Sequence, residues 1–312
     1  LSLLKANRRT RRRWIERGVT VHLYAGPEEG LTLKRAYLEK GGDGTRLIEI
    51  DVKRGAHHDM LRIGGMYSTL LKLAMLGAID AVVGGPNCRT RSVLRHTPRE
   101  GFPGPSRTAG YPWGLPDAPP DEQGKLLQDD ALMLRMLTLY MVAQIARDAM
   151  VKERSKRCLK AKVGFLLEQP AAPEWCPECA SWWRNRTWLL FKHYYQMEEV
   201  TFYQGDFGGE ARKTTTCGTN LGFQPPDPLV HGGRSREQGP ELDSSKLSRW
   251  APGMMHEVAR LLIEEVEGKE VRLKKLSWTA HVDNGHVPFR RDCVVCQRSA
   301  ARQRPHRRHD DP

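Results

Sequence analysis

Short apolar runs rich in β-branched residues alternate with longer segments of helical periodicity, and this alternation constrains the fold more than any other feature of the chain. Runs such as IDAVV (79–83) and VGFLL (163–167) are apolar at nearly every position. Parallel strands have this character because helices cover both faces of their sheet. Strands that alternate with helices favour βαβ units. We therefore expect an α/β, Rossmann-like fold, with a mostly parallel sheet and helices on both faces.

The pattern assigns individual elements. The expected strands are Val19–Tyr24, Leu47–Val52, Ile79–Gly85, Val163–Gln169 and Val200–Gln204, and the expected helices are Leu31–Lys40, Met66–Gly77, Asp129–Lys156 and Pro177–Met197. Residues 97–125 and 205–247 are rich in Gly, Pro and polar residues and predict long loops. Trp250–Val266 predicts an amphipathic helix whose inward side chains are Met254, Met255, Val258, Leu261 and Leu262.

The net charge of +13 is concentrated at the two ends of the chain. Residues 1–17 carry seven Lys and Arg against one Glu, or +6, and residues 289–312 carry seven Arg against three Asp, or +4. Cationic ends on a nearly neutral body favour arms that contact the phosphates of DNA or RNA. Two solvated, disordered tails are the alternative.

Composition also bears on the compartment. Seven cysteines among 312 residues are too few for a disulfide scaffold. The arginine-rich N-terminus is not followed by the apolar run of a secretory signal. The most apolar stretch, Met136–Ala146, has about half of the ~20 residues that a bilayer requires. We expect an intracellular, nuclear protein without a membrane span and, because the chain starts at Leu1, a piece of something longer.

A candidate zinc site lies near the C-terminus, in the spacing His281-x4-His286-x6-Cys293-x2-Cys296. Two imidazoles and two thiolates satisfy tetrahedral zinc, and four protein ligands are typical of a structural site. The surrounding segment, 277–312, has almost no apolar core, so metal binding would supply its folding free energy.

The same segment carries a resemblance. SWTAHVDNGHVPFRRDCVVCQRSAARQRPHRR (277–308) resembles the His-His-Cys-Cys zinc module that precedes the catalytic core of retroelement integrases, although its gap between the His pair and the Cys pair is shorter. The resemblance implies a retrotransposon polyprotein, with the rest of the polyprotein and nucleic acid as partners and DNA integration as context. We expect no strand-transfer core within these 312 residues.

A second Cys-x-x-Cys pair, Cys176 and Cys179, precedes a Trp-rich helical pattern. Such a pair can bind zinc with ligands from elsewhere, form a redox couple, or remain two free thiols at a helix start. His193 is the nearest further ligand in the sequence. The sequence leaves these three interpretations of the pair open.

Two expected strands place polar groups where a nucleotide-like ligand binds in α/β folds. A glycine turn, LYAG (23–26), follows the first strand, and glycine turns that lead into a helix suit phosphate-bearing ligands. The second strand ends in EIDV, which puts Glu49 and Asp51 at the carboxyl edge of the sheet. Carboxylates at this edge accept hydrogen bonds from ribose hydroxyls.

Two further strands end in residues that can carry chemistry. Cys88 follows the third strand and a Gly-Gly-Pro turn, beside Arg89 and Arg91, whose charges would lower its pKa and favour the nucleophilic thiolate. Glu168 ends the fourth strand on the same edge. A buried structural thiol and a salt-bridged strand-end carboxylate are the alternatives.

Taken in order, these motifs resemble the cytosine-5 DNA methyltransferases. LYAG, with Tyr24 and Gly26, is similar to the first cofactor motif of that family. Glu49 and Asp51 resemble its ribose-binding acid, Asp59 its adenine contact, GGPNC (84–88) its nucleophile loop and Glu168 its base-binding glutamate. The resemblance implies S-adenosylmethionine as cofactor, Cys88 adding to C6 of a flipped cytosine, Glu168 holding the ring nitrogen, and methyl transfer to C5.

The sequence also departs from that family. His22 stands where Asp is usual, Asn87 replaces a Pro, and 27–29 (PEE) replaces a small glycine-rich turn. We therefore predict a nucleic-acid-binding fragment of a retrotransposon polyprotein with a degenerate methyltransferase-like domain. An active cytosine-5 methyltransferase and a zinc-dependent interaction module with a decayed enzyme fold are the alternatives. The expected divisions are a basic arm (1–17), the Rossmann-like domain (18–225), a linker with the amphipathic helix (226–276) and the zinc segment (277–312).

Overall fold

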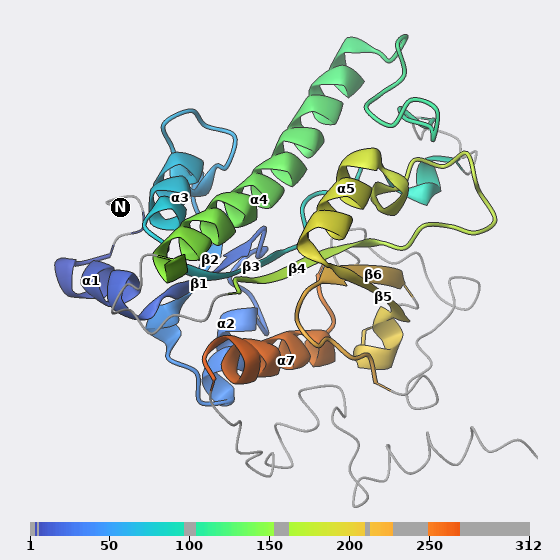
Figure 1. Ribbon diagram of the computed structural model, residues 1–312. Helices are drawn as coiled ribbons and strands as arrows, with labels where there is room; N and C mark the ends of the chain where they lie inside the picture. The colour runs from blue at the N-terminus through green and yellow to red at the C-terminus, as the bar shows by residue number, and fades with distance from the viewer. Residues whose placement is uncertain are drawn as a thin grey trace, which may run out of the picture.

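A computed structural model describes residues 4, 6–96, 104–152, 162–209, 213–226 and 249–268. Six strands form one sheet in the order β2-β1-β3-β4-β6-β5 (Figure 1). Their bounds are β1 Val19–Leu23, β2 Leu47–Ile50, β3 Ile79–Gly84, β4 Gly164–Pro170, β5 Glu198–Tyr203 and β6 Thr214–Thr219. The zinc segment, with His281, His286, Cys293 and Cys296, lies outside the described residues.

The sheet is mixed, so the expectation of a mostly parallel sheet was wrong. The pairs β1–β2, β1–β3 and β3–β4 are parallel, as the apolar runs predict. The pairs β4–β6 and β5–β6 are antiparallel. The α/β class is confirmed, and the antiparallel half comes from a strand that the sequence pattern did not predict.

That strand is β6, with the sequence TTTCGT inside a stretch that reads as a polar loop. Threonine is β-branched and suits a strand, yet its hydroxyl hides the strand from an apolar pattern. Thr216 hydrogen-bonds Thr201 of β5 at 2.7 Å, and Thr219 donates its hydroxyl to the Phe165 carbonyl at 2.6 Å. Because internal hydrogen bonds satisfy its threonine hydroxyls, β6 can lie buried between β4 and β5.

Helices cover both faces of the sheet (Figure 1). Their bounds are α1 Arg8–Arg17, α2 Leu33–Glu39, α3 Met66–Met75, α4 Pro120–Lys152, α5 Arg186–Tyr195 and α7 Pro252–Leu261. One core joins α3, α4 and α5 to the sheet, and a second core joins α2 and α7 to the other face. Helix α4 starts nine residues before its predicted start, with Pro120 leading and Asp121 and Glu122 in its first turn, as helix N-termini favour.

The predicted amphipathic helix near the end of the described chain is confirmed. It consists of α7 and a following π-helical turn, Leu262–Val266. Met254, Val258 and Leu261 are fully buried, and Met255 is partly buried against the same core. Because α7 packs on α2 and the sheet, it belongs to the same hydrophobic core as the strands.

The basic N-terminal segment forms helix α1, so the alternative of a disordered tail is wrong for residues 8–17. Asn7 caps the helix by accepting from Thr10 N–H at 2.8 Å. Trp14 anchors it: the indole is buried and donates to the Thr45 carbonyl at 2.6 Å.

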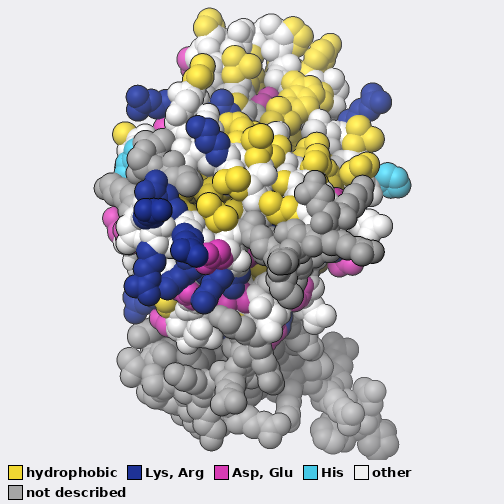
Figure 2. Space-filling model, turned by 60° about the vertical axis from the view of Figure 1, so that its left-hand side comes forward, with side chains coloured by type: hydrophobic (Ala, Val, Ile, Leu, Met, Phe, Trp, Pro, Cys, Tyr) yellow, Lys and Arg dark blue, Asp and Glu magenta, His cyan; other side chains and the backbone are white. Residues whose placement is uncertain are grey.

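On the face drawn in Figure 2, Lys and Arg side chains gather on the left-hand side, with acidic side chains among them, and hydrophobic side chains occupy the upper part.

No helix in the described part of the chain is both long and apolar enough to cross a membrane.

Candidate functional site

The parallel pairings of β1, β3 and β4 end in register at one edge of the sheet, and β4 continues for three residues beyond it. Leu23 of β1 is in register with Gly84 of β3, and Gly84 is in register with Leu167 of β4. The chain order reverses here, since β2 lies on one side of β1 and β3 on the other. In open α/β sheets such a switch point is where ligands bind. The predicted residues at the ends of these parallel pairings therefore lie at a common edge.

Glu168 is buried at this edge and holds a local network. Its Oε1 lies 3.1 Å from Lys213 Nζ and accepts from Gln204 Nε2 at 3.4 Å. The backbone of Gly85 passes so close that a Cβ there would lie 2.6 Å from Glu168 Oε2. A glycine is therefore needed at position 85, because it lets the Cys88 loop approach the Glu168 carboxylate. Lys213 and Gln204 were not predicted, because they lie in or beside polar stretches far along the chain.

Cys88 shares this environment, but its predicted activation is wrong. Burial raises the pKa of the Cys88 thiol to about 11, Lys213 lowers it and Glu168 raises it. The two neighbouring arginines that were expected to activate the thiol are engaged elsewhere: Arg89 Nε lies 3.0 Å from Asp129, and Arg91 Nη2 lies 2.8 Å from Asp130. At neutral pH the thiol is therefore protonated and a weak nucleophile.

On the cofactor side, both carboxylate oxygens of Glu49 have partners within the protein. Its Oε1 accepts from Lys34 N–H at 3.0 Å and lies 3.5 Å from His22 Nδ1, and its Oε2 lies 2.7 Å from Arg54 Nη1. Burial alone would raise the pKa of Glu49, but His22, the Lys34 amide and Arg54 lower it to about 2. Glu49 acts here as a structural anion.

The other predicted cofactor residues also have internal partners. Asp51 accepts from the backbone N–H of Gly26 and of Lys53, each at 2.8 Å. Asp59 accepts from Leu61 N–H at 2.8 Å. Tyr24 has a positive φ of 60° and donates its hydroxyl to the Leu132 carbonyl at 2.7 Å. The structure brings Gly26, Glu49 and Asp51 together, because Gly26 N–H donates to Asp51 and Arg54 contacts both the Gly26 carbonyl and Glu49. Both carboxylates expected to hold a cofactor ribose therefore have partners within the protein.

A cavity of about 390 Å³ lies beside the outer strand β2. Its lining includes Glu49 and Arg54, whose Nη2 is buried with no hydrogen-bond partner among the described residues. Its other lining side chains include Trp14, Lys34, His57 and His58. Cys88 and Glu168 do not line this cavity, so it does not join the two groups of predicted site residues.

Trp250, at the entry to α7, closes over the edge that holds Glu168. Its ring lies 4.9 Å from the ring of His22, and its Nε1 would be 3.3 Å from a Cβ on Gly85. The next backbone N–H, of Ala251, donates to Gln204 Oε1 at 2.9 Å. Sequence reasoning assigned Trp250 only to the start of a helix, since contacts across the sheet edge leave no local pattern.

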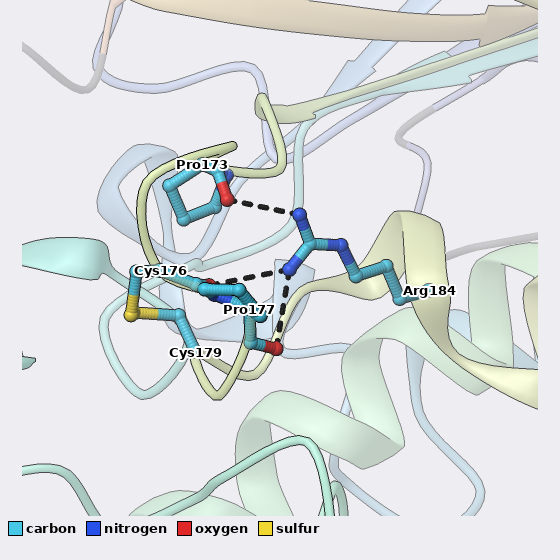
Figure 3. Close-up of a disulfide and its surroundings, with 5 residues drawn as sticks. All are labelled: Pro173, Cys176, Pro177, Cys179 and Arg184. Atoms are coloured by element: carbon cyan, nitrogen blue, oxygen red, sulfur yellow. Dashed lines mark hydrogen bonds between the residues drawn. A yellow bond between two sulfur atoms is a disulfide. The ribbon is translucent and has the colours of Figure 1, made fainter.

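A different group of side chains has the chemistry of a metal site. A ring nitrogen of His96 and the Sγ atoms of Cys176 and Cys179 all lie within 4.8 Å of one another. In the structure the two cysteines form a disulfide (Figure 3). The sequence identified the pair but not His96, which lies 80 positions before Cys176; His193 is nearer in sequence but belongs to α5.

Neither a comparison with models of protein families nor a search of curated proteins gives a match to this sequence.

Proposed function

We propose that this chain is a nucleic-acid-binding fragment of a retrotransposon polyprotein, and that its α/β domain is a methyltransferase-like domain that no longer transfers methyl groups. The observation that carries the proposal is helix α1, an arginine-rich helix fixed to the body of the domain by Trp14. A fixed cationic helix presents its charges to a phosphate backbone without the entropic cost of ordering a free arm.

The charges of α1 are available for such a contact. Arg8, Arg9 and Arg17 are exposed, and none of them pairs with an acid of the described chain. Arg12 pairs with Glu16 at 2.6 Å, but that pair is also on the surface. Phosphate contacts from arginine are strong, and they are independent of base sequence. The helix therefore supports binding to DNA or RNA rather than reading of a sequence.

Loss of the transfer reaction is supported by the candidate site. The carboxylates that would hold the cofactor, Glu49 and Asp51, are engaged by internal partners. The Cys88 thiol has a pKa of about 11, with burial as the main cause. A site with a protonated nucleophile and occupied cofactor acceptors is a scaffold rather than a catalyst.

The zinc segment belongs to the same proposal. His281, His286, Cys293 and Cys296 would hold one zinc ion in a basic module next to the α/β domain, in a nuclear polyprotein product. The change His281→Ala tests this, because it removes one of four ligands. We expect it to lower the zinc content of the purified chain, and unchanged zinc content would contradict the proposal.

The nucleic-acid proposal is tested by the salt dependence of DNA binding. Each phosphate contact contributes about 0.9 to the slope of log K against log salt. The triple change of Arg8, Arg9 and Arg17 to Gln should make this slope shallower by about 3. Arg186→Gln is the matched control, because it is an exposed arginine on the distant helix α5. A triple variant with the slope of the unchanged protein would refute the assignment to α1.

An active S-adenosylmethionine-dependent cytosine-5 methyltransferase is the second candidate. It is favoured by the register that aligns Leu23, Gly84 and Leu167, because Cys88 then follows the end of β3 and Glu168 lies in β4 just past the last residue paired with β3. Radiolabelled S-adenosylmethionine tests it, with cytosine-containing DNA as acceptor and Cys88→Ala as control. Binding and transfer that require Cys88 would support this candidate, and no cofactor binding would eliminate it.

A further inference from the structure

The group formed by His96, Cys176 and Cys179 lies apart from the residues assigned to either proposed function. Cys176 and Cys179 are buried, with exposed fractions of 1% and 2%, whereas His96 is partly exposed. The three side chains come from two loops, one between β3 and α4 and one between β4 and α5. A zinc ion at tetrahedral distances would set its nitrogen and sulfur ligands about 3.5–3.8 Å apart. Ligand atoms within 4.8 Å of one another need only small rotations to reach that arrangement.

The loop that carries the two sulfurs is held independently of them. The Arg184 guanidinium donates to the carbonyls of Pro173 at 2.9 Å, Cys176 at 3.2 Å and Pro177 at 3.3 Å (Figure 3). Cys179 N–H donates to the Cys176 carbonyl at 3.2 Å, which closes a tight turn. Because these contacts involve only backbone acceptors, the turn can keep its shape when the sulfur–sulfur bond is absent.

The other loop is attached to the same turn. Ala109 N–H donates to the Glu178 carbonyl at 2.8 Å, and Thr108 forms a β-bridge with Cys179. The cation of Arg184 lies against the turn, and a nearby cation favours thiolates over thiols. A preformed turn with two thiolates and an imidazole at its side is the donor set that zinc prefers.

We propose that His96, Cys176 and Cys179 form a redox-controlled zinc site. In the oxidised state the two sulfurs are joined in the disulfide. A dithiol reduces this bond with two electrons and two protons and becomes a disulfide itself, whereas a phosphine supplies the two electrons, becomes the phosphine oxide, and leaves water to supply the protons. Either reductant breaks the sulfur–sulfur bond and gives two thiols. Zinc then binds both sulfurs and His96 and displaces the two thiol protons. Oxidation by a peroxide, which accepts the two electrons and is reduced to water, re-forms the sulfur–sulfur bond and releases the ion.

Such a site would join the two loops that leave the edge of Cys88 and Glu168. His96 follows Cys88 by eight positions, and the Cys176 turn follows Glu168 by eight positions. With three protein ligands among the described residues, the fourth position is available to water or to another donor on the exposed side of His96. The reduced, zinc-bound state would therefore fix the geometry of this edge, and the oxidised state would leave His96 free.

The test uses the full chain with Cys293→Ser and Cys296→Ser, so that the C-terminal candidate site does not contribute. This protein is reduced with a phosphine under argon, loaded with zinc, desalted and analysed for zinc per chain. Loading with cobalt(II) gives a second readout, because sulfur-to-cobalt absorption reports thiolate ligands. We expect one metal ion per chain after reduction and none in the disulfide form.

Single and double variants test whether each residue is a metal ligand. His96→Ala should weaken zinc binding at least about tenfold, since even loss of an outer-shell partner costs that much. His193→Ala, an exposed histidine on α5, is the matched control and should not change it. Cys176→Ser with Cys179→Ser should abolish the cobalt–thiolate band. The proposal is overturned if the reduced chain binds no zinc, or if His96→Ala binds it as tightly as its parent with an unchanged circular dichroism spectrum.

Discussion

Lys213 and Glu168 form an ion pair, with 3.1 Å between Nζ and Oε1, at the junction of the parallel and antiparallel halves of the sheet. Lys213 directly precedes β6, and Glu168 lies in β4 opposite Cys217 of β6. Burial alone would lower the pKa of Lys213, but Glu168 and Cys88 raise it. The pair therefore holds the one unpredicted strand against the candidate site and sets the charge around Cys88.

Replacing Lys213 with Met should destabilise the protein by about 3 kcal/mol, because it leaves the buried Glu168 carboxylate without its cation. Urea denaturation measures the change in the free energy of unfolding. The matched control is Lys192→Met, which breaks the more exposed Lys192–Glu199 pair of 3.0 Å and should cost less than about 1 kcal/mol. Equal losses in the two variants would show that the Lys213 pair has no special structural role.

Cys88 should react slowly with alkylating reagents, because its pKa is about 11. At pH 8 we expect a rate about a hundredfold below that of an ordinary thiol, since only the thiolate reacts. Glu168→Gln should increase the rate, because Glu168 raises the pKa of Cys88. Mass spectrometry of the Cys88 peptide over pH 7–11 gives the titration. A midpoint near pH 8 in the native protein would contradict the assignment of Cys88 as a protonated thiol.

Much of the parallel half could be predicted from the sequence, because its strands are apolar at nearly every position. The runs at 79–83 and 163–167 became β3 and β4, and each is bounded by recognisable turns. Strand β6 could not be predicted in this way. Its stability comes from hydrogen bonds such as Thr219 to Phe165 O, which link positions 54 residues apart. No local pattern reports such a contact.

The candidate site shows the same division. Strand-end position was enough to assign Cys88 and Glu168 to one edge, because the carboxyl ends of parallel strands meet there. Their partner Lys213 was not predictable, because it lies 45 positions after Glu168. His96, the neighbour of the Cys176 pair, was not predictable for the same reason, since it lies 80 positions before Cys176. Arg89 was expected to lower the pKa of Cys88, but it forms an ion pair with Asp129 on α4 instead. Burial and tertiary contacts, rather than neighbours in sequence, determine the pKa of Cys88.

Glu49 should make stability depend on pH in acid. Its pKa is about 2 in the folded protein against 4.5 for an ordinary glutamate, so the folded state favours the charged form. This stabilisation is complete above about pH 4.5 and is lost as the pH falls toward 2. Glu49→Gln should therefore cost about 3 kcal/mol at pH 7, and the difference from the unchanged protein should shrink between pH 4.5 and 2. Glu198→Gln, at an exposed carboxyl on β5, should show no such convergence.

Trp14→Ala should release helix α1 from the domain. The indole is buried and its N–H donates to the Thr45 carbonyl, so truncation removes both packing and a hydrogen bond. We expect a loss of about 3 kcal/mol in the free energy of unfolding. Ile15→Ala, at an exposed position of the same helix, should cost far less. Amide hydrogen exchange locates the effect: residues 8–17 should lose protection in Trp14→Ala while β1 and β3 keep theirs. Because short isolated helices are marginal in water, protection that persists in α1 would mean that contacts other than Trp14 hold it in place.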